Sequence, residues 1–455
     1  MKFVNRHTER KVLGNLIGKG SAMLFGRRRV GKTALIKNCL TNTPNVFYQA
    51  VKLPAPLIYK ELSMLIGEAS NNPVLKSGDI KDISIILNIF AEQCKGWTLV
   101  LDEFGYMVES DPALPSIIQR FLDNKRDAVG LFLTGSTYSI IQSLLGEKSP
   151  LWGRIDNSME ILPLSFIYTA DFWEELPFDY RAGLYGALGG IPYNWERAVI
   201  KDEFFDTLAH SFFLPASPLY QEVYYILREE LREPKVYMAV LQAMASGRRR
   251  FSEISDASGI PVSNLSKYLE VLKGLNLITQ EVPVNEKLTG GKGLWRIKDP
   301  MIRFWFKYVL PYRHMIEVEA GEKVTPILKK TWDDYMGEIY EDIAMQLTIE
   351  LIKRGELPFV EKLGRWWNKD IEFDIVGMNQ KKICLLGEVK WGYFSNEDLG
   401  KFEQKVKRVP FELDKDIKYI IFAGKGFKVD VPSGITAISG ERLFKLSASG
   451  GSEPF

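Results

Sequence analysis

The strongest constraint on the fold is a glycine-rich run at residues 26–33, GRRRVGKT. It satisfies the pattern G-x-x-x-x-G-K-[ST], follows the apolar stretch SAMLF and precedes the stretch TALIKNCL, which favours a helix. In such a loop, backbone N–H groups and a helix N-terminus surround phosphates, the lysine neutralises the β and γ oxygens, and the hydroxyl ligates Mg²⁺. The run predicts that ATP or ADP is held by Gly26, Arg29, Gly31, Lys32, Thr33 and Ala34.

A second run, WTLVLDE at residues 97–103, is an apolar strand that ends in two acids. We expect Asp102 to hold Mg²⁺ through water, and Glu103 to orient or deprotonate the attacking water. The two motifs occur in the order and context that nucleotide hydrolysis requires, so a chance glycine loop is a poor explanation. The pair predicts an ATPase site with Thr33 and Asp102 on the metal.

The same region shows the rhythm of a parallel sheet. Between about residue 20 and residue 136, short apolar runs (SAMLFG, VFYQAV, WTLVLDE and GLFLTGS) alternate with helical stretches. This pattern is typical of a parallel sheet with helices on both faces. A chain of 455 residues has room for roughly three domains, so the expected fold class is multidomain α/β.

Composition excludes several classes of protein. With 46% hydrophobic and 25% charged residues, the chain has the composition of a globular protein. No apolar run reaches the roughly 18–20 residues of a membrane helix, and MKFVNRHTER is too polar for a signal peptide, so a cytoplasmic location is expected. The three cysteines, Cys39, Cys94 and Cys384, and the three histidines are scattered, which argues against zinc sites and disulfide frameworks.

Residues 216–300 have the pattern of a winged helix-turn-helix, with a turn at Gly259 and wing glycines near residue 290. The recognition helix is expected at 263–273, with Ser263 as its cap, Gly274 at its end and a core stripe of Leu265, Leu269 and Leu272. Asn264, Lys267 and Lys273 would then point outward. The segment carries twelve Lys and Arg against ten Asp and Glu, a modest excess for DNA. DNA contact and an internal hinge therefore remain alternatives.

Four charged residues near the C-terminus lie on two neighbouring strand-like runs within IEFDIVGMNQKKICLLGEVKW, residues 371–391. Glu372 and Asp374 share one strand face, and Glu388 and Lys390 share another. A hairpin loop of odd length, for example Met378 to Lys382, would place both pairs on one face, with Asp374 and Glu388 roughly 7–8 Å apart on a diagonal. An even loop would separate the pairs, and the sequence does not determine the register.

If the pairs meet, the carboxylates would suit Mg²⁺ or Mn²⁺ rather than zinc. The metal would activate water and hold a phosphate oxygen, and Lys390 would position the water or stabilise the developing charge. The competing interpretation is an edge hairpin whose charges face solvent.

The N-terminal motifs resemble those of the archaeal STAND-type ATPases within the AAA+ group. FVNRHTE at residues 3–9 resembles the motif on the adenine side, with Arg6 and Glu9 at the matching positions. LTGSTYSII implies that Ser136 senses the γ-phosphate, and SPLWGRIDNSMEILPL implies a family arginine at Arg154, which is alternatively a surface ion-pair residue. GGIPYNW at 189–195 resembles the motif of a lid over the nucleotide.

Asp374 followed by Glu388-Val389-Lys390 resembles the signature of the PD-(D/E)xK restriction-endonuclease-like fold. The resemblance implies that Asp374, Glu388 and Lys390 are catalytic, with metal at the first two. It implies a further metal-binding acid at Glu341 in MGEIYEDIAMQL, which is equally well explained as a solvated helix residue. Lys405 and Lys407 on the following helix are more simply explained as solvated residues.

These patterns divide the chain into six parts. They are a P-loop ATPase core at 1–160, a helical lid at 161–215, the winged helix at 216–300, a linker at 301–330, a nuclease-like domain at 331–446 and a disordered tail at 447–455. The first hypothesis is an ATP-gated nuclease that uses Mg²⁺, and the second is an ATP/ADP switch with a non-cleaving C-terminal domain. Expected partners are nucleic acid, DNA rather than RNA, and a homo-oligomer in the ATP state; no membrane is expected.

Overall fold

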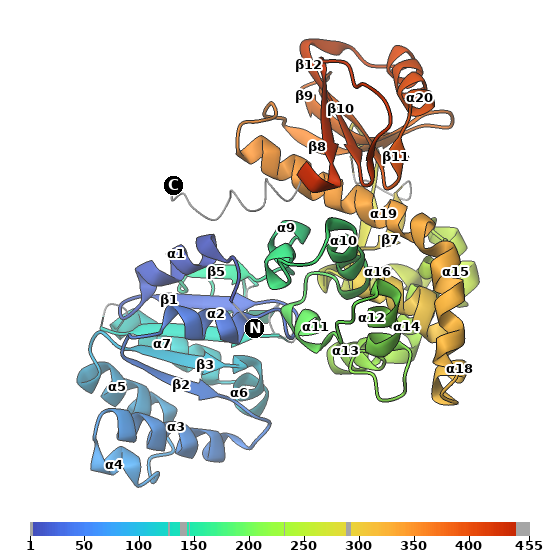
Figure 1. Cartoon of the computed structure of the whole chain (residues 1–455). Coiled ribbons are helices and arrows are strands. Elements are labelled where there is room, and N and C mark those ends of the chain that lie inside the picture. Colours follow the sequence, from blue (N-terminus) through green and yellow to red (C-terminus); the bar gives the residue numbers. More distant parts are fainter. Residues whose placement is uncertain are drawn as a thin grey trace. The chain divides into compact units, whose positions relative to one another are not determined.

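The computed structural model describes residues 3–125, 128–136, 143–144, 146–231, 233–287 and 293–442. It divides into two compact units, Met1–Pro163 and Leu164–Phe455, whose elements are labelled in Figure 1. The predicted tail at 447–455 lies outside the described residues.

The first unit is built on a five-stranded parallel sheet with the strand order β2-β3-β4-β1-β5. The strands are β1 (Ser21–Phe25), β2 (Asn45–Gln49), β3 (Thr98–Asp102), β4 (Gly130–Gly135) and β5 (Asn157–Glu160). The first four correspond to the apolar runs of the sequence, so the predicted parallel sheet is confirmed. The sequence does not predict β5, because its residues NSME alternate between half-buried and exposed and carry little apolar signal.

Helices cover both faces of this sheet. They are α1 (His7–Leu16), α2 (Lys32–Cys39), α3 (Ala55–Ala69), α4 (Pro73–Lys76), α5 (Ile83–Gln93), α6 (Phe104–Ser110) and α7 (Leu114–Lys125). On one face, Met23 and Leu101 pack into a core shared with α3, α5, α6 and α7. Ala22, Leu24 and Phe132 alternate with such residues along the strands and are equally buried. The sheet is therefore shielded from water on both sides, as a parallel sheet requires.

The second unit begins with helices and continues into the winged helix. Its first helices are α9 (Phe166–Thr169), α10 (Phe178–Leu188), α11 (Pro192–Arg197), α12 (Phe204–Phe212) and α13 (Glu222–Glu230). The winged helix consists of α14 (Pro234–Ala245), α15 (Phe251–Ser258), α16 (Val262–Gly274), β6 (Ile278–Glu281) and β7 (Leu294–Ile297). The two strands pair antiparallel.

Helix α16 is the predicted recognition helix. The predicted core stripe of Leu265, Leu269 and Leu272 is fully buried. The prediction that Ser263 caps the helix is wrong, because the helix begins at Val262 and Pro261 occupies the N-cap position. Proline has no side-chain oxygen that could accept from the first N–H groups, and the helix has no side-chain cap.

Residues 301–330, predicted as a linker, form short helical segments, the first of which carry a buried aromatic core. The segments are α17 (Pro300–Phe304), a π-helix (Trp305–Val309), 3-10 helices (Leu310–Tyr312 and Gly321–Lys323) and α18 (Arg313–Glu317). Phe304 is completely buried, and Trp305 donates a hydrogen bond of 2.6 Å to the carbonyl oxygen of Tyr220. The first part of this segment, up to Val309, therefore packs into the second unit.

The C-terminal part of this unit is a mixed five-stranded sheet with the order β14-β12-β10-β9-β8. Its elements are α19 (Val324–Lys353), β8 (Lys362–Trp367), β9 (Glu372–Asn379), β10 (Lys382–Lys390), α20 (Asn396–Lys407), β12 (Leu413–Ala423) and β14 (Ile435–Ser439), with a separate pair, β11 (Tyr393–Phe394) and β13 (Gly426–Phe427). Strands β8, β9 and β10 are antiparallel, whereas β10, β12 and β14 are parallel. The sequence predicts β9, β10, α20 and β12 but not the two outer strands.

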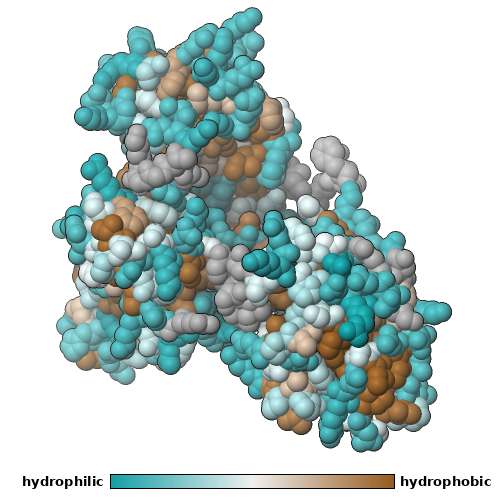
Figure 2. Space-filling view, turned by 180° about the vertical axis from the view of Figure 1, so that it is seen from behind, coloured by the Kyte–Doolittle hydropathy of each residue, from teal (hydrophilic) through white to brown (hydrophobic). Residues whose placement is uncertain are grey.

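Most of the surface seen in Figure 2 is hydrophilic, with hydrophobic residues gathered in smaller patches. Large exposed hydrophobic side chains include Leu57 on α3, Val74 on α4 and Ile85 on α5. Among the described residues, no helix is both long enough and apolar enough to cross a membrane.

A buried ion cluster centred on Asp342 of α19 joins the wing to the C-terminal sheet. Its carboxylate accepts from Arg296 of β7 at 2.9 Å, Arg303 of α17 at 3.2 Å and Arg365 of β8 at 3.4 Å. Burial alone would raise the pKa of Asp342, but the three guanidinium groups, Arg296 foremost, hold that pKa well below its usual range. The cluster therefore depends on an ionised Asp342.

We predict that Asp342→Asn destabilises the second unit by about 3–5 kcal/mol, because it removes the one carboxylate that Arg296, Arg303 and Arg365 share. The measurement is urea unfolding of the full chain at pH 7, followed by tryptophan fluorescence. The matched control is Asp334→Asn, which removes an exposed carboxylate from the same helix and should change stability by less than about 0.5 kcal/mol.

The loss of stability caused by Asp342→Asn should depend on pH. Because the folded pKa is depressed, the contribution of Asp342 is complete above the unfolded pKa of about 3.9 and is lost as pH falls through the folded value. The stability difference between wild type and Asp342→Asn should therefore narrow below about pH 4. A difference that stays constant down to pH 2 would contradict this assignment.

Candidate functional site

The glycine-rich loop between β1 and α2 has the backbone geometry of a phosphate cradle. Gly26 has a φ of 138°, and a Cβ there would lie 2.5 Å from the carbonyl oxygen of Ile161. Gly31, the N-cap of α2, has a φ of 102°, and Arg29 has a φ of 65°. Left-handed residues at these positions turn successive N–H groups toward one centre in front of the α2 N-terminus.

Lys32 and Thr33 follow this loop in the first turn of α2. Lys32 is buried, and its ammonium donates to the carbonyl oxygens of Gly26 at 2.8 Å and Arg27 at 3.1 Å. The Thr33 hydroxyl donates to Asp102 at 2.9 Å. The structure therefore brings together the two residues that the sequence assigns to the nucleotide metal.

The acids at the end of β3 are held by hydroxyl groups from β4 and the residue that follows it. Thr134 donates to Asp102 at 2.6 Å, and its own oxygen accepts from the N–H of Glu103 at 3.0 Å. Ser136 donates to the Glu103 carboxylate at 2.6 Å. The predicted catalytic base and the predicted γ-phosphate sensor are therefore in direct contact.

The other residues predicted to bind nucleotide do not all lie near the glycine loop. Arg6 is buried beside the loop and donates to the carbonyl oxygens of Val30 at 3.3 Å and Leu162 at 2.6 Å, and to Glu9 at 3.0 Å. Ala34 is exposed in the first turn of α2.

Arg154 lies at the other end of the sheet. Its carbonyl oxygen accepts from Ser21, where β1 begins, whereas the glycine loop follows the last residue of β1. Its side chain pairs with Asp123 at 3.2 Å. The structure therefore does not bring Arg154 to the loop of its own chain, and its surroundings match the surface ion pair that the sequence left as the alternative.

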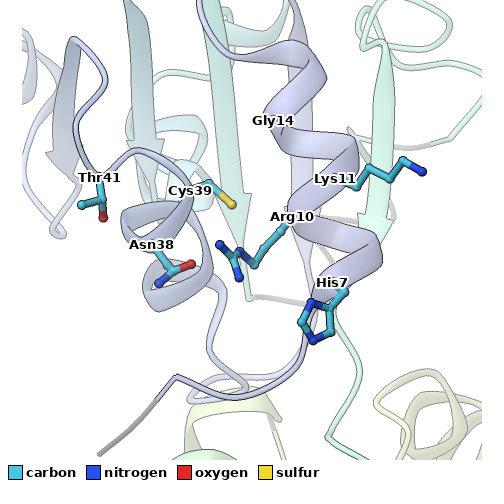
Figure 3. A pocket seen from close by; sticks show the side chains of 7 residues that line it. All are labelled: His7, Arg10, Lys11, Gly14, Asn38, Cys39 and Thr41. Atoms are coloured by element: carbon cyan, nitrogen blue, oxygen red, sulfur yellow. The ribbon is translucent and has the colours of Figure 1, made fainter. Parts of the chain in front are cut away.

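A separate polar pocket of about 710 Å³ lies between α1 and the end of α2, as Figure 3 shows. Its lining residues are His7, Arg10, Lys11, Gly14, Asn38, Cys39 and Thr41. Burial raises the pKa of the Cys39 thiol, and Arg10 partly opposes this shift. None of the lining residues belongs to the glycine loop, so this pocket is distinct from the phosphate cradle.

The acidic residues of the second unit meet through an irregular hairpin. Strands β9 and β10 are joined by only Gln380 and Lys381, so the loop is even, the case that by itself would separate the two charged pairs. The pairing shifts between Ile383↔Met378 and Leu385↔Gly377, which leaves Cys384 as the extra residue of a β-bulge. The last paired residues are Gly387 and Ile375, and Glu388 and Asp374 come next on their strands. The bulge shifts the register by one residue, so the even loop does not separate the two carboxylates, and the charge of Glu388 acts on Asp374.

Asp374 and Glu388 form the centre of this candidate acidic site. Asp374 accepts from the N–H of Val389 at 2.8 Å. Burial, followed by the charge of Glu388, raises the pKa of Asp374 to about 7. Burial also raises the pKa of Glu388, against the opposing effect of Lys405. One Glu388 oxygen accepts from Lys405 at 2.6 Å, and the other, Oε2, is buried without a hydrogen-bond partner in the described structure.

The two remaining predicted residues are differently placed. Glu341 of α19 pairs with Arg365 at 2.8 Å. Burial raises the pKa of Glu341 to about 7, although Arg365 opposes the shift; Asp374 adds to it. Lys390, in contrast, donates to both oxygens of Asp398 at 2.7 and 2.6 Å. Its ammonium is thus committed to the start of α20.

The acidic site has the chemistry of a divalent-cation site, although its side chains are not yet gathered around one point. Its oxygen donors suit Mg²⁺ or Mn²⁺. One of them, Glu388 Oε2, is buried and accepts no hydrogen bond in the described structure. The mutual electrostatic effects of Glu341, Asp374 and Glu388 on pKa also fit cation binding. Within the described ranges, however, no three His, Cys, Asp or Glu side chains are close enough to hold an ion.

Sequence reasoning missed three residues that shape these sites: Thr134, Arg365 and the role of Lys405. A signal existed for Lys405, because Asp398 and Lys405 are seven residues apart and so share one face of a helix. No local pattern reveals Arg365, whose partners are distant in the sequence.

Three family models match parts of the chain. A model described as an AAA domain matches residues 19–168, and one described as bacterial regulatory protein, arsR family, matches 238–280. A model described as archaea bacterial proteins of unknown function matches 305–402, which includes the candidate acidic site. The first unit is thus a P-loop ATPase domain of the AAA type, and the second unit contains a winged helix.

A relative in Methanocaldococcus jannaschii, the uncharacterised protein MJECL04, is 30% identical over 433 residues, which span 93% of this chain and 95% of that protein. Among solved structures, the Walker-type ATPase paby2304 of Pyrococcus abyssi is 21% identical with a TM-score of 0.52, and the similarity covers 67% of this chain and 96% of that one. The ORC2 protein of Aeropyrum pernix is 15% identical with a TM-score of 0.47, covering 71% and 95%. The paby2304 match shows the fold of this chain's ATPase part.

We predict that Lys32→Ala weakens nucleotide binding by roughly 10- to 150-fold, because it removes one hydrogen bond to a charged group. Titration of the full chain with fluorescent ADP in Mg²⁺ measures this change. The control is Lys37→Ala, which removes an exposed ammonium from the same helix and should leave affinity unchanged. Equal losses in both variants would contradict the assignment of Lys32 to the phosphates.

Proposed function

We propose that this chain, which belongs to the family of the archaeal protein MJECL04, is a STAND-type ATPase coupled to a metal-dependent nuclease site. The nucleotide is held in the first unit by the glycine loop, and phosphodiester cleavage occurs at the candidate acidic site of the second unit. The observation that carries the nuclease part is that Asp374 and Glu388 directly adjoin the last paired residues of β9 and β10, both partly buried, with one Glu388 oxygen unpartnered in the described structure.

The order of elements supports a restriction-endonuclease-like domain. Helix α19 supplies Glu341, strands β9 and β10 supply Asp374 and Glu388, and α20 leads into β12. Burial and, after it, repulsion from the Glu388 carboxylate raise the pKa of Asp374 toward neutrality. A site with this property favours a cation, because a bound cation relieves the repulsion.

Within this proposal, Asp374 and Glu388 hold a divalent ion, and Glu341 is a third acid nearby. The ion, when bound, polarises a phosphate oxygen and lowers the pKa of water. A water oxygen would then form a new bond to phosphorus and lose a proton to surrounding water, the bond from phosphorus to one sugar oxygen would break, and that oxygen would take up a proton from surrounding water. The side chains would orient the attacking water for this step.

For the ATPase part, Lys32 and the loop N–H groups hold the phosphates, and Thr33 and Asp102 hold Mg²⁺. In the nucleotide-bound protein, Glu103 orients the attacking water and Ser136 keeps that carboxylate in place. We further propose that the nucleotide state controls the acidic site. ATP can shift the equilibrium between the two states of the protein only by as much as its affinities for those states differ.

A second candidate function is a switch that binds DNA without cutting it. Two acids of the acidic site are already paired, Glu341 with Arg365 and Glu388 with Lys405. Paired in this way, the C-terminal domain would serve as a binding module, while the winged helix contacts DNA through α16. Asn264 and Lys267 are exposed on that helix, as this role requires.

We predict that Lys267→Ala weakens binding to duplex DNA by a similar factor whatever the DNA sequence, because one phosphate contact is lost. The slope of log affinity against log salt concentration should become shallower by about 1. Both effects are measured by fluorescence anisotropy at KCl concentrations between about 50 and 200 mM, the range over which phosphate contacts change DNA affinity strongly. Lys330→Ala removes an exposed lysine from α19 and serves as the control. Unchanged binding in Lys267→Ala would favour an internal hinge.

We also predict that Asp374→Asn lowers cleavage at least about 100-fold, because a ligand to the metal is lost. Plasmid, single-stranded DNA and RNA are incubated with the full chain in Mg²⁺ or Mn²⁺, with ATP, ADP or no nucleotide. Asp416→Asn, an exposed position on β12, should cleave like wild type. Loss of cleavage in Lys32→Ala would add the nucleotide control.

The two candidate functions separate cleanly in this assay. Absence of cleavage under every condition, together with a metal titration that detects no site, would overturn the nuclease and leave the switch.

A further inference from the structure

Helix α3 of the first unit exposes large apolar side chains on one face. Leu57, Met64 and Leu65 are 48%, 38% and 37% exposed, whereas the opposite face of the helix is buried in the core. The helix lies at the outside of the first unit, with α4 beside its end (Figure 1), and Val74 of α4 is 58% exposed. Single exposed apolar residues are ordinary, but several on neighbouring positions indicate an interaction surface.

Two residues of opposite charge flank Met64 on this face. Lys60, Met64 and Glu68 follow one another at intervals of four residues, so they form one ridge along the helix. Lys60 and Met64 lie side by side, because a Cβ on Gly78 would be 3.0 Å from Cγ of the first and 3.2 Å from Cγ of the second. Both charged residues are exposed, and within the described part of the chain neither forms an ion pair.

We propose that this face of α3 joins two copies of the chain as an antiparallel pair of helices, with a two-fold axis at Met64. In such a pair, Lys60 of each copy meets Glu68 of the other, so the same contact forms twice. Glu61 meets Gly67 of the other copy rather than a like charge. A parallel pair would place Lys60 on Lys60 and Glu68 on Glu68, so the charges select the antiparallel arrangement.

Burial of the apolar residues supplies the attraction between the two copies. Met64 packs against its own counterpart at the axis, and Leu57 reaches the segment that leads into α4 of the other copy, where Val74 is exposed. One helix face is smaller than the roughly 1,200–2,000 Å² of a standard interface, so we expect a reversible dimer. None of these residues belongs to the glycine loop or the acidic site. The contact therefore does not depend on nucleotide, unlike the oligomer expected in the ATP state.

The test is sedimentation equilibrium of the full chain, with ADP and without nucleotide. Wild type should pass from monomer to dimer with a dissociation constant of about 1–100 µM, the range of a weak interface. Lys60→Glu and Glu68→Lys each turn two attractions into two repulsions, so each should weaken the dimer about 10-fold or more. The variant with both changes re-forms both ion pairs and should recover most of the affinity. Lys81→Glu, which reverses an exposed lysine before α5, is the matched control.

A second measurement locates the axis. Met64→Cys should form a disulfide between two copies under mild oxidation, because packed helices bring residues on the axis within the about 7 Å between Cα atoms that a disulfide allows. Ile85→Cys, exposed on α5, should not cross-link, and wild type reports any linkage through Cys39, Cys94 or Cys384.

Three results would overturn the inference. The first is a wild-type chain that stays monomeric at every concentration, which would leave this face to a different partner. The second is a dimer that neither charge reversal weakens. The third is a doubly reversed variant that stays as weak as the single variants, because the two charges would then not meet across the axis.

Discussion

The organisation of the second unit depends on one buried carboxylate, that of Asp342. Removing a charge from water is costly unless partners replace the lost hydration, and here the partners come from three separate elements: β7, α17 and β8. All three elements contact the same carboxylate. The wing, the helix after it and the edge of the C-terminal sheet are therefore fixed relative to α19 by electrostatics as well as by packing.

This arrangement also bears on what the winged helix does. Beyond β6, Val284 donates its N–H to the carbonyl oxygen of Arg365 at 2.9 Å and packs against the core of the C-terminal sheet. The base of the wing thus contacts another part of the chain, as expected for an internal hinge, while the N-terminal half of α16 is exposed, as DNA contact requires. The two interpretations therefore concern different surfaces of one module. Arg365 also pairs with Glu341, so the wing base and the acidic site share a residue.

Local patterns predicted the parts of the fold that local physics determines. The glycine loop, the four buried strands of the first sheet and the leucine stripe of α16 follow from glycine conformation and apolar periodicity, which are properties of short segments. β5 and the outer strands β8 and β14 carry weaker signals, because edge strands need burial on fewer sides. The register at Asp374 was beyond prediction, since it depends on whether Cys384 bulges to let Leu385 and Leu386 face the core. The sequence predicts which residue types the acidic site contains. It does not predict the partners of Lys390 and Lys405, because these depend on how the fold places α20.

Packing within the second unit links its helices to the acidic site. Trp391 directly follows Lys390 and lies 6.3 Å from Phe178 of α10 and 5.5 Å from Tyr340 of α19, measured between ring centres. Helix α10 belongs to the region that the sequence assigns to a lid, and it shares one compact unit with the acidic site. Because a packed aromatic cluster transmits displacement rather than absorbing it, a shift of α10 would reach the end of β10. The glycine loop lies in the other unit, so a change at the loop must affect the second unit before it can move α10. Control by nucleotide therefore requires that ATP and ADP differ in their effect on residues that follow Pro163.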